Sequence, residues 1–232
     1  EDNDGTEVNQ AYRGSRGLNG NTFRDGRQAF FFDSHRFAGD VGWRQNQQTF
    51  DSFFYENKML PGVTGSYAYV YNVNRVFGED TPNGAFANTG DFQMAGHLVN
   101  LLWKPNPVTT LTGYAYLLDF DDFAAESTAT YGLRAMGEIP LPQLKLPTLP
   151  GAAGSAILYT AEYARQSDYA DNAGSFDLDY GLLEGGVRLF GVSFKAAYEL
   201  LEGGAMNGTR ALQTPLATLH AFNGWADMFL TT

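Results

Sequence analysis

The sequence predicts an all-β protein, an antiparallel up-and-down β-barrel that crosses a membrane with its strands. Three observations support this fold class. Apolar and polar residues alternate over about ten segments, each roughly ten to fourteen residues long, which exceeds the usual strand of soluble sheets. Short and long connections alternate between these segments. The 232 residues also include 27 Gly, 13 Tyr and 18 Phe, a composition that suits strands and turns.

The clearest strand signal lies between Thr128 and Ile139. Odd positions such as Tyr131 and Leu133 are apolar or aromatic, whereas even positions such as Arg134 are polar or charged. Because successive side chains of a strand point to opposite faces, this pattern predicts one apolar and one polar face. The same alternation marks residues 63–77, 157–166 and 193–200.

Three other segments are less regular. Between Phe176 and Leu189 the apolar phase changes near Leu182, which predicts a β-bulge there. Both faces of the segment 111–120 are fairly apolar. The run of three phenylalanines at 30–32 breaks the alternation outright, so we do not expect it to continue a strand.

The connections predict how the barrel is oriented. Short connections lie at 18–21, 60–62, 105–107 and 190–191, and long connections at 35–46, 78–89, 121–127, 167–175 and 202–232. In outer-membrane barrels short turns face the periplasm and long loops face outward. The stretch 140–154, with four prolines, breaks the rhythm. Since proline cannot donate to a β-ladder, we expect an extended turn insertion outside the sheet.

Composition excludes several classes of function. The 15 Lys and Arg against 26 Asp and Glu give a net charge of −11, which disfavours nucleic-acid binding. The absence of cysteine excludes disulfides, thiolate metal sites and a cysteine nucleophile. The chain starts at Glu1 without a signal peptide, and residues 228–232 match no recognisable pattern for a natural end. We therefore expect residues 1–232 to form one barrel domain that is incomplete at both ends.

Several blocks of sequence resemble a known family. These blocks are EVNQAY at 7–12, GRQAF at 26–30, RFAGDVGWRQNQQTFD at 36–51, YLLDFD at 116–121, YTAEYARQSDYADN at 159–172 and QTPLATLHAFNGWAD at 213–227. The chain is similar to the alginate-export family of porin-like outer-membrane β-barrels. The resemblance implies a barrel of about 18 strands in the outer membrane of a Gram-negative bacterium, of which this chain supplies about ten. It further implies a passive channel without enzymatic activity or cofactor, whose partners are outer-membrane lipid and the transported solute.

The resemblance also implies an arginine-bearing lumen. Arginine reads carboxylates well because its planar fork binds in a bidentate way and stays charged. The predicted pore-lining and solute-binding residues are Arg24, Arg27, Arg36, Arg44, Arg134, Glu138, Glu162, Lys195 and Glu199. The acidic members limit the preference for anions, and Asp25 and Phe31 depart from the family pattern. The predicted solutes are therefore small molecules or anionic saccharides.

Alternatives remain open at this stage. The chain could be a soluble or surface-exposed β-sheet module that binds glycans, or an outer-membrane enzyme or adhesin, although no catalytic motif is present. The connection 35–47 could fold into the lumen and narrow it, or pack on the rim with Trp43 as its anchor. His97 is predicted to face the pore or an interface.

Predictions also follow for three further groups of residues: the acidic clusters, the histidines and the aromatic residues near strand ends. Acidic clusters could be solvated loops or calcium sites, at Asp119, Asp121, Asp122 and Glu126 and at Asp168, Asp171, Asp177 and Asp179. The three histidines are too widely separated in sequence to predict a metal site. Aromatic girdles at the membrane interfaces are predicted from Tyr12, Tyr55, Tyr67, Trp103, Tyr163 and Tyr198.

Overall fold

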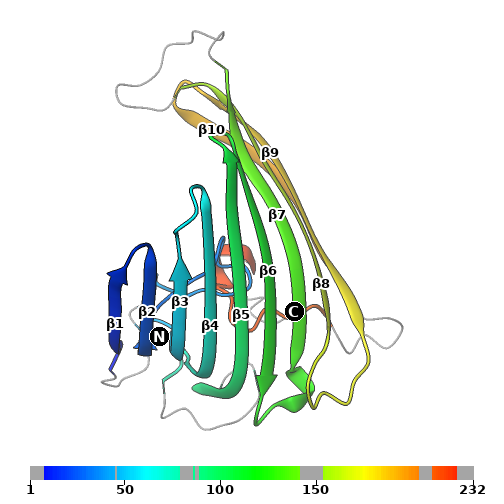
Figure 1. The fold of residues 1–232 in the computed structure, drawn as a ribbon. Coiled ribbons are helices and arrows are strands. Elements are labelled where there is room, and N and C mark those ends of the chain that lie inside the picture. The colour runs from blue at the N-terminus through cyan, green and yellow to red at the C-terminus, as the bar shows by residue number, and fades with distance from the viewer. Residues whose placement is uncertain are drawn as a thin grey trace.

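The chain forms one open antiparallel sheet in which every strand pairs with its neighbours in sequence (Figure 1). The computed structural model describes residues 8–44, 46–78, 86, 89–141, 154–203 and 211–223. The ten strands are β1 (Ala11–Leu18), β2 (Asn21–Gln28), β3 (Thr49–Asn57), β4 (Val63–Asn74), β5 (Asp91–Asn106), β6 (Thr109–Phe120), β7 (Thr128–Pro140), β8 (Ala156–Asp168), β9 (Asp177–Leu189) and β10 (Val192–Leu201). A short 3-10 turn, η2 (Ala124–Glu126), and one turn of helix, α1 (His220–Asn223), complete the described elements. No helix in these ranges is long and apolar enough to span a membrane.

The predicted strands and their rhythm of connections are confirmed. Strand lengths run from 8 residues in β1 to 16 in β5. Long links follow β2, β4, β6 and β8, and tight turns follow β1, β3, β5 and β9. We call these two edges of the sheet the long-link end and the short-turn end. Most of the predicted proline-rich insertion, residues 142–153, lies outside the described residues.

Strand register assigns each side chain to one of two faces. One row of paired residues runs Gly14, Arg24, Phe54, Ala68, Leu98, Tyr116, Thr130, Gln166 and Leu178. Most of this row is buried, and Ala68 and Leu98 are fully inaccessible. Side chains one position away point to the opposite face, where large apolar residues are exposed. The exposed set includes Val99, Leu101, Trp103, Tyr131, Leu133, Tyr163, Leu183, Phe194 and Tyr198.

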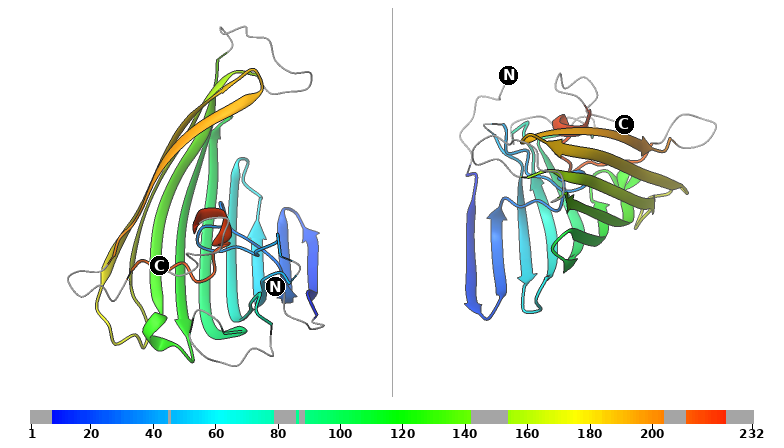
Figure 2. Two further views of the ribbon diagram at one scale, coloured as in Figure 1. Left: turned by 180° about the vertical axis from the view of Figure 1, so that it is seen from behind. Right: turned by 90° about the horizontal axis from the view of Figure 1, so that it is seen from above.

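Two segments between and after the strands cover the buried face. Residues 29–48, which link β2 to β3, and residues 211–223 both lie within the curve of the sheet, on its concave side (Figure 2). They contact each other through a parallel bridge between Ala38 and Leu216. The Gln48 side-chain amide donates to the Gly39 carbonyl at 2.7 Å and to the Leu216 carbonyl at 3.2 Å.

Aromatic packing holds residues 29–48, which we call the covering link, against the sheet. Phe30 stacks on Phe50 with 4.4 Å between ring centroids, and Phe37 lies 5.3 Å from Tyr114. Phe32 is also buried in this cluster. The three phenylalanines that break the strand pattern therefore belong to a link, and two of them form the core on the concave side.

Several sequence predictions fail on local detail. No bulge lies near Leu182, because β9 pairs in continuous register with both β8 and β10. Trp43 is about half exposed and is not the anchor of its link, a role that Phe30 and Phe37 fill. Tyr12 lies on the concave face, since it pairs with Gly26 two residues from Arg24, so it cannot join a girdle on the outside. His97, predicted to face the pore or an interface, lies on the convex face, where its Nδ1 is 2.8 Å from the Tyr67 hydroxyl.

The two faces predict opposite sensitivities to truncation. Leu98→Ala should destabilise the protein by about 2–5 kcal/mol, because it opens a cavity beneath the covering link. Leu101→Ala, on the exposed face of the same strand, should cost much less, because truncating an exposed side chain leaves no enclosed cavity. Urea unfolding in detergent micelles measures both. Equal losses in the two variants would contradict this assignment of faces.

Candidate functional site

The candidate site is a charged region of the concave face, at the level where the covering link meets strands β7 to β10. One row of the sheet pairs Thr112, Arg134, Glu162, Leu182 and Glu199 in succession. Because these residues occupy one row, their side chains emerge on the same side. Sequence analysis named Arg134, Glu162 and Glu199 separately, and the register brings them together.

Arg36 from the covering link joins this row through Glu199. Its Nε lies 2.9 Å from Glu199 Oε1, and its side chain is only 1% exposed. Tyr180 donates its hydroxyl to the same carboxylate oxygen at 2.8 Å. The Arg36 guanidinium also lies 5.0 Å from the centre of the Phe222 ring. Arg36 therefore connects the covering link, the wall and the 211–223 segment.

A second ion pair fixes the covering link three residues before Arg36. Asp33 Oδ1 lies 2.9 Å from an Arg134 nitrogen, and Arg134 Nε is 3.6 Å from Glu162. Tyr114 donates its hydroxyl to Glu162 at 2.7 Å. A Cβ atom at Gly132 would overlap the Tyr114 ring, so glycine is the residue that lets this ring lie flat against β7.

Further toward the short-turn end, charges on the concave face pair across strands. Lys195 lies 3.0 Å from Glu184, and Arg188 pairs with Glu138. Lys195 is about half exposed, as is Glu138, so water screens these pairs and each contributes little to stability. They do, however, set the local charge of the surface.

Arg24 differs from the other arginines of the concave face. Its guanidinium lies 4.4 Å from the centre of the Phe54 ring and 5.7 Å from that of Tyr12. No carboxylate of the described residues lies within ion-pairing distance of it. Arg24 is therefore a cation held over aromatic rings, able to meet an anionic group from solution.

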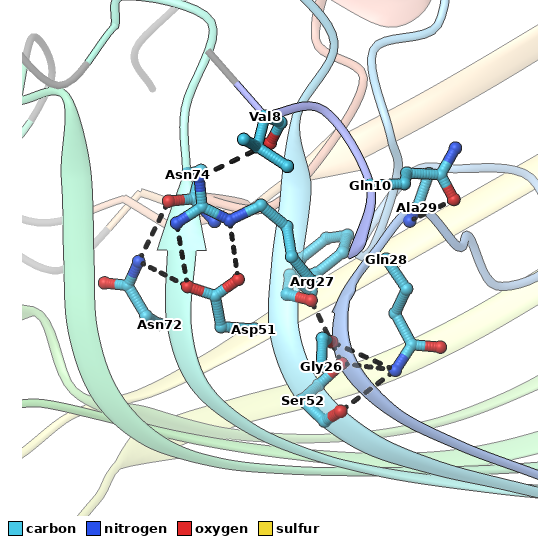
Figure 3. Close-up of polar contacts among 11 residues, drawn as sticks. Val8, Gln10, Gly26, Arg27, Gln28, Ala29, Asp51, Ser52, Asn72 and Asn74 are labelled. Atoms are coloured by element: carbon cyan, nitrogen blue, oxygen red, sulfur yellow. Dashed lines mark hydrogen bonds and ion pairs between the residues drawn. The ribbon is translucent and has the colours of Figure 1, made fainter. Parts of the chain in front are cut away.

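Arg27 was predicted to line the pore together with Arg24, but the structure places the two side chains on opposite faces of the sheet. Arg27 lies on the convex face, where Nε is 2.8 Å from Asp51 Oδ1 and a second nitrogen is 3.1 Å from Oδ2 (Figure 3). The physical reason is the two-residue period of a strand, since Arg27 stands three positions after Arg24 and must point the other way. Arg44, also in the predicted set, lies in the covering link with its guanidinium 4.7 Å from the Trp43 ring centre.

Sequence reasoning missed several residues of this region. Asp33, Tyr114 and Tyr180 hold the predicted charges in place, yet none of them was named. Tyr114 and Tyr180 look like ordinary strand residues, because nothing in the alternation separates a tyrosine that bonds a carboxylate from one that packs. Asp33 follows the phenylalanine run, and only the fold of the link brings it to Arg134.

The covering link also contains a partly buried histidine. His35 stacks on Phe31 with 3.9 Å between ring centroids, and its Nδ1 lies 3.6 Å from Asp40. Burial lowers the pKa of His35 below its ordinary value, and the nearby Asp40 carboxylate offsets part of that shift. The imidazole is therefore predominantly neutral at pH 7.

The acidic clusters have other uses in the described structure. Asp168 accepts a hydrogen bond from the Phe176 backbone at 3.1 Å, and Asp119 accepts one from Ser127 at 3.4 Å. Both carboxylates thus shape links at the long-link end. Within the described ranges, no three Asp, Glu or His side chains converge in a way that could hold a metal ion.

Comparison with known proteins supports the fold. No protein-family model matches the sequence, and no curated protein does. Among solved structures, the chain is similar to OpdL of Pseudomonas aeruginosa, with 14% identity and a TM-score of 0.57 over 85% of this chain and 50% of OpdL. It is similar also to OccK3 (OpdO), with 12% identity and a TM-score of 0.59 over 78% of this chain and 43% of that one.

A third similar structure is the outer-membrane protein OpdK of the same organism, which has also been solved with vanillate. It shares 12% identity and a TM-score of 0.56 over 78% of this chain and 44% of OpdK. The chain thus spans half or less of the length of the structures it matches. The comparisons do not show the alginate-export family in particular, which stays a prediction. They show that the chain has the fold of part of the wall of such an outer-membrane β-barrel.

Proposed function

We propose that this chain forms part of the wall and the constriction of a porin-type diffusion channel in the outer membrane of a Gram-negative bacterium. The observation that carries the proposal is the contrast between the two faces of one sheet. The convex face exposes aromatic and aliphatic side chains suited to lipid, whereas the concave face carries paired charges beneath a docked link. A soluble glycan-binding module would leave that convex face in water, which is unfavourable for so large an apolar area.

The covering link supplies the narrowing element of the proposed channel. In the proposed channel, as in other outer-membrane barrels, the long-link end faces outward and the short-turn end faces the periplasm. The 29–48 link leaves the wall at the long-link end and lies against its concave side. Arg36 and Asp33 hold it there through Glu199 and Arg134, so solutes would pass beside a fixed obstacle.

The balance of charge favours small polar solutes over strongly charged polymers. Most charges of the candidate site are paired with a charge of opposite sign: Arg36 with Glu199, Arg134 with Asp33 and Glu162, Arg188 with Glu138, and Lys195 with Glu184. Such a surface orients dipolar solutes but gives little net selection by sign. Arg24 is the position at which a carboxylate of a solute would bind. Anionic saccharides remain a finer hypothesis that rests on the resemblance to alginate exporters.

The proposed role of Arg24 predicts a change in ion selectivity. Arg24→Glu in the protein that carries this chain should shift the reversal potential in planar bilayers toward cation preference. The shift should be larger at about 0.1 M salt than at about 1 M, where the Debye length falls from about 10 Å to about 3 Å. Arg165→Gln is the matched control, because Arg165 pairs with Asp177 on the convex face. Equal shifts in both variants would remove Arg24 from the pore.

The proposed role of the covering link as a constriction predicts a change in single-channel conductance. Asp33→Ala removes one partner of a mostly buried ion pair, a change that typically costs about 3–5 kcal/mol. The link should then detach for part of the time, and single-channel recordings should show higher conductance with added current noise. Glu184→Gln, which disrupts an exposed pair away from the link, should leave conductance nearly unchanged. An unaltered conductance in Asp33→Ala would exclude the link as the constriction.

A further inference from the structure

Most strands of the sheet present several large apolar side chains on the convex face. On β5 these are Val99, Leu101 and Trp103, on β7 they are Tyr131, Leu133 and Ile139, and on β10 they are Phe194, Tyr198 and Leu200. Together they form an apolar band that crosses the sheet from β4 to β10. Under the proposed membrane location, this band faces lipid.

The first two strands depart from this pattern. The convex positions of β1 are Ala11, Arg13 and Ser15, and those of β2 are Asn21, Phe23, Asp25 and Arg27. Phe23 is the one large apolar side chain among them. We call these residues the β1–β2 face.

The apolar band shifts along the strands in a regular way. The convex row that contains Arg165 on β8 contains Tyr131 on β7, and the row that contains His97 on β5 contains Tyr69 on β4. The edge of the band therefore moves toward the long-link end from β8 to β4, as expected for strands that tilt relative to a membrane.

If the edge of the apolar band continues to move toward the long-link end across β3, β2 and β1, charged residues of β1 and β2 fall inside the band. Asp25 on β2 pairs with Phe53 on β3, Phe53 pairs with Tyr69 on β4, and Arg13 on β1 pairs with Asp25. Arg13 and Asp25 thus stand in the same row as aromatic side chains at the level of the lipid. Charged side chains on a lipid-facing surface are unfavourable, most of all near the bilayer centre.

The charges of the β1–β2 face are grouped in pairs of opposite sign. Arg27 and Asp51 are joined by two hydrogen bonds and are mostly buried (Figure 3). Arg13 lies 3.4 Å from Asp25, and its side chain is 89% exposed, so it can still meet another partner. Phe23 stacks on Tyr55 with 4.8 Å between ring centroids, which places an aromatic pair beside these charges.

We propose that the β1–β2 face packs against a second copy of this protein in the membrane rather than against lipid. Its cations and anions balance across adjacent strands, so a rotated copy of the same surface supplies complementary charges. The aromatic pair gives such an interface a compact apolar centre with a polar rim. This inference rests on the proposed outer-membrane location.

Site-directed cross-linking in native outer membranes tests the proposal, because the 232-residue chain contains no cysteine. Ser15→Cys places a thiol on the β1–β2 face, and Leu133→Cys places one in the apolar band. Both variants are treated with a flexible bis-maleimide and then separated by denaturing electrophoresis. We expect Ser15→Cys to give a band of twice the protein's mass and Leu133→Cys to give only monomer. A Phe23→Cys variant repeats the test at a second position of the face.

The outcomes separate the two proposals. No dimer from either Ser15→Cys or Phe23→Cys, or a cross-linked band with the mass of a different protein, overturns the second copy as the partner. Labelling of Leu133→Cys in intact membranes by a charged, water-soluble maleimide shows instead that the apolar band is not in lipid. That result would reject the membrane location itself. Protection of Leu133→Cys together with a Ser15→Cys dimer supports both.

Discussion

The antiparallel hydrogen-bond ladder is the constraint on which the rest of this structure depends. In a bilayer each backbone group must find its partner in a neighbouring strand, so register can vary little along the sheet. Once register is fixed, each side chain belongs to one face, and a displacement of one residue would exchange the faces. The register shifts that do occur are local, at Ser15/Leu18, Asp51/Ser52, Val70/Asn72 and Trp103/Asn106.

Two kinds of interaction hold the covering link on the concave face: aromatic packing and ion pairs. Aromatic rings from the 29–48 link pack against buried side chains of strands β3 and β6 and join them in one apolar cluster. Ion pairs through Arg36 and Arg134 then fix where the link lies relative to β7, β8 and β10. Buried pairs of this kind contribute little net stability but penalise other placements of the link. In the proposed channel that positional control would set the bore, because the bore depends on where the link lies.

Charges on the two faces serve different purposes for the same physical reason. In the proposed channel, the acids and bases of the concave face would meet water and solute, so paired charges could remain partly hydrated. On the convex face, lipid would give no hydration, and the described charges of β1 and β2 occur there as pairs such as Arg27 with Asp51. The local concentration of such pairs on two strands, beside an otherwise apolar band, distinguishes that part of the wall.

The sequence by itself determined the fold class, the strand segments and the alternation of short and long connections, because these depend on local period and turn composition. It also identified Arg36, Arg134, Glu162 and Glu199 as candidate pore residues. It misplaced Arg27, although the period of a strand already separates it from Arg24. Only the tertiary structure decided that Arg36 meets Glu199, 163 positions away, and that Asp33 meets Arg134. Those contacts depend on the path of the 29–48 link, which carries no periodic signal and takes its shape from packing against a finished sheet.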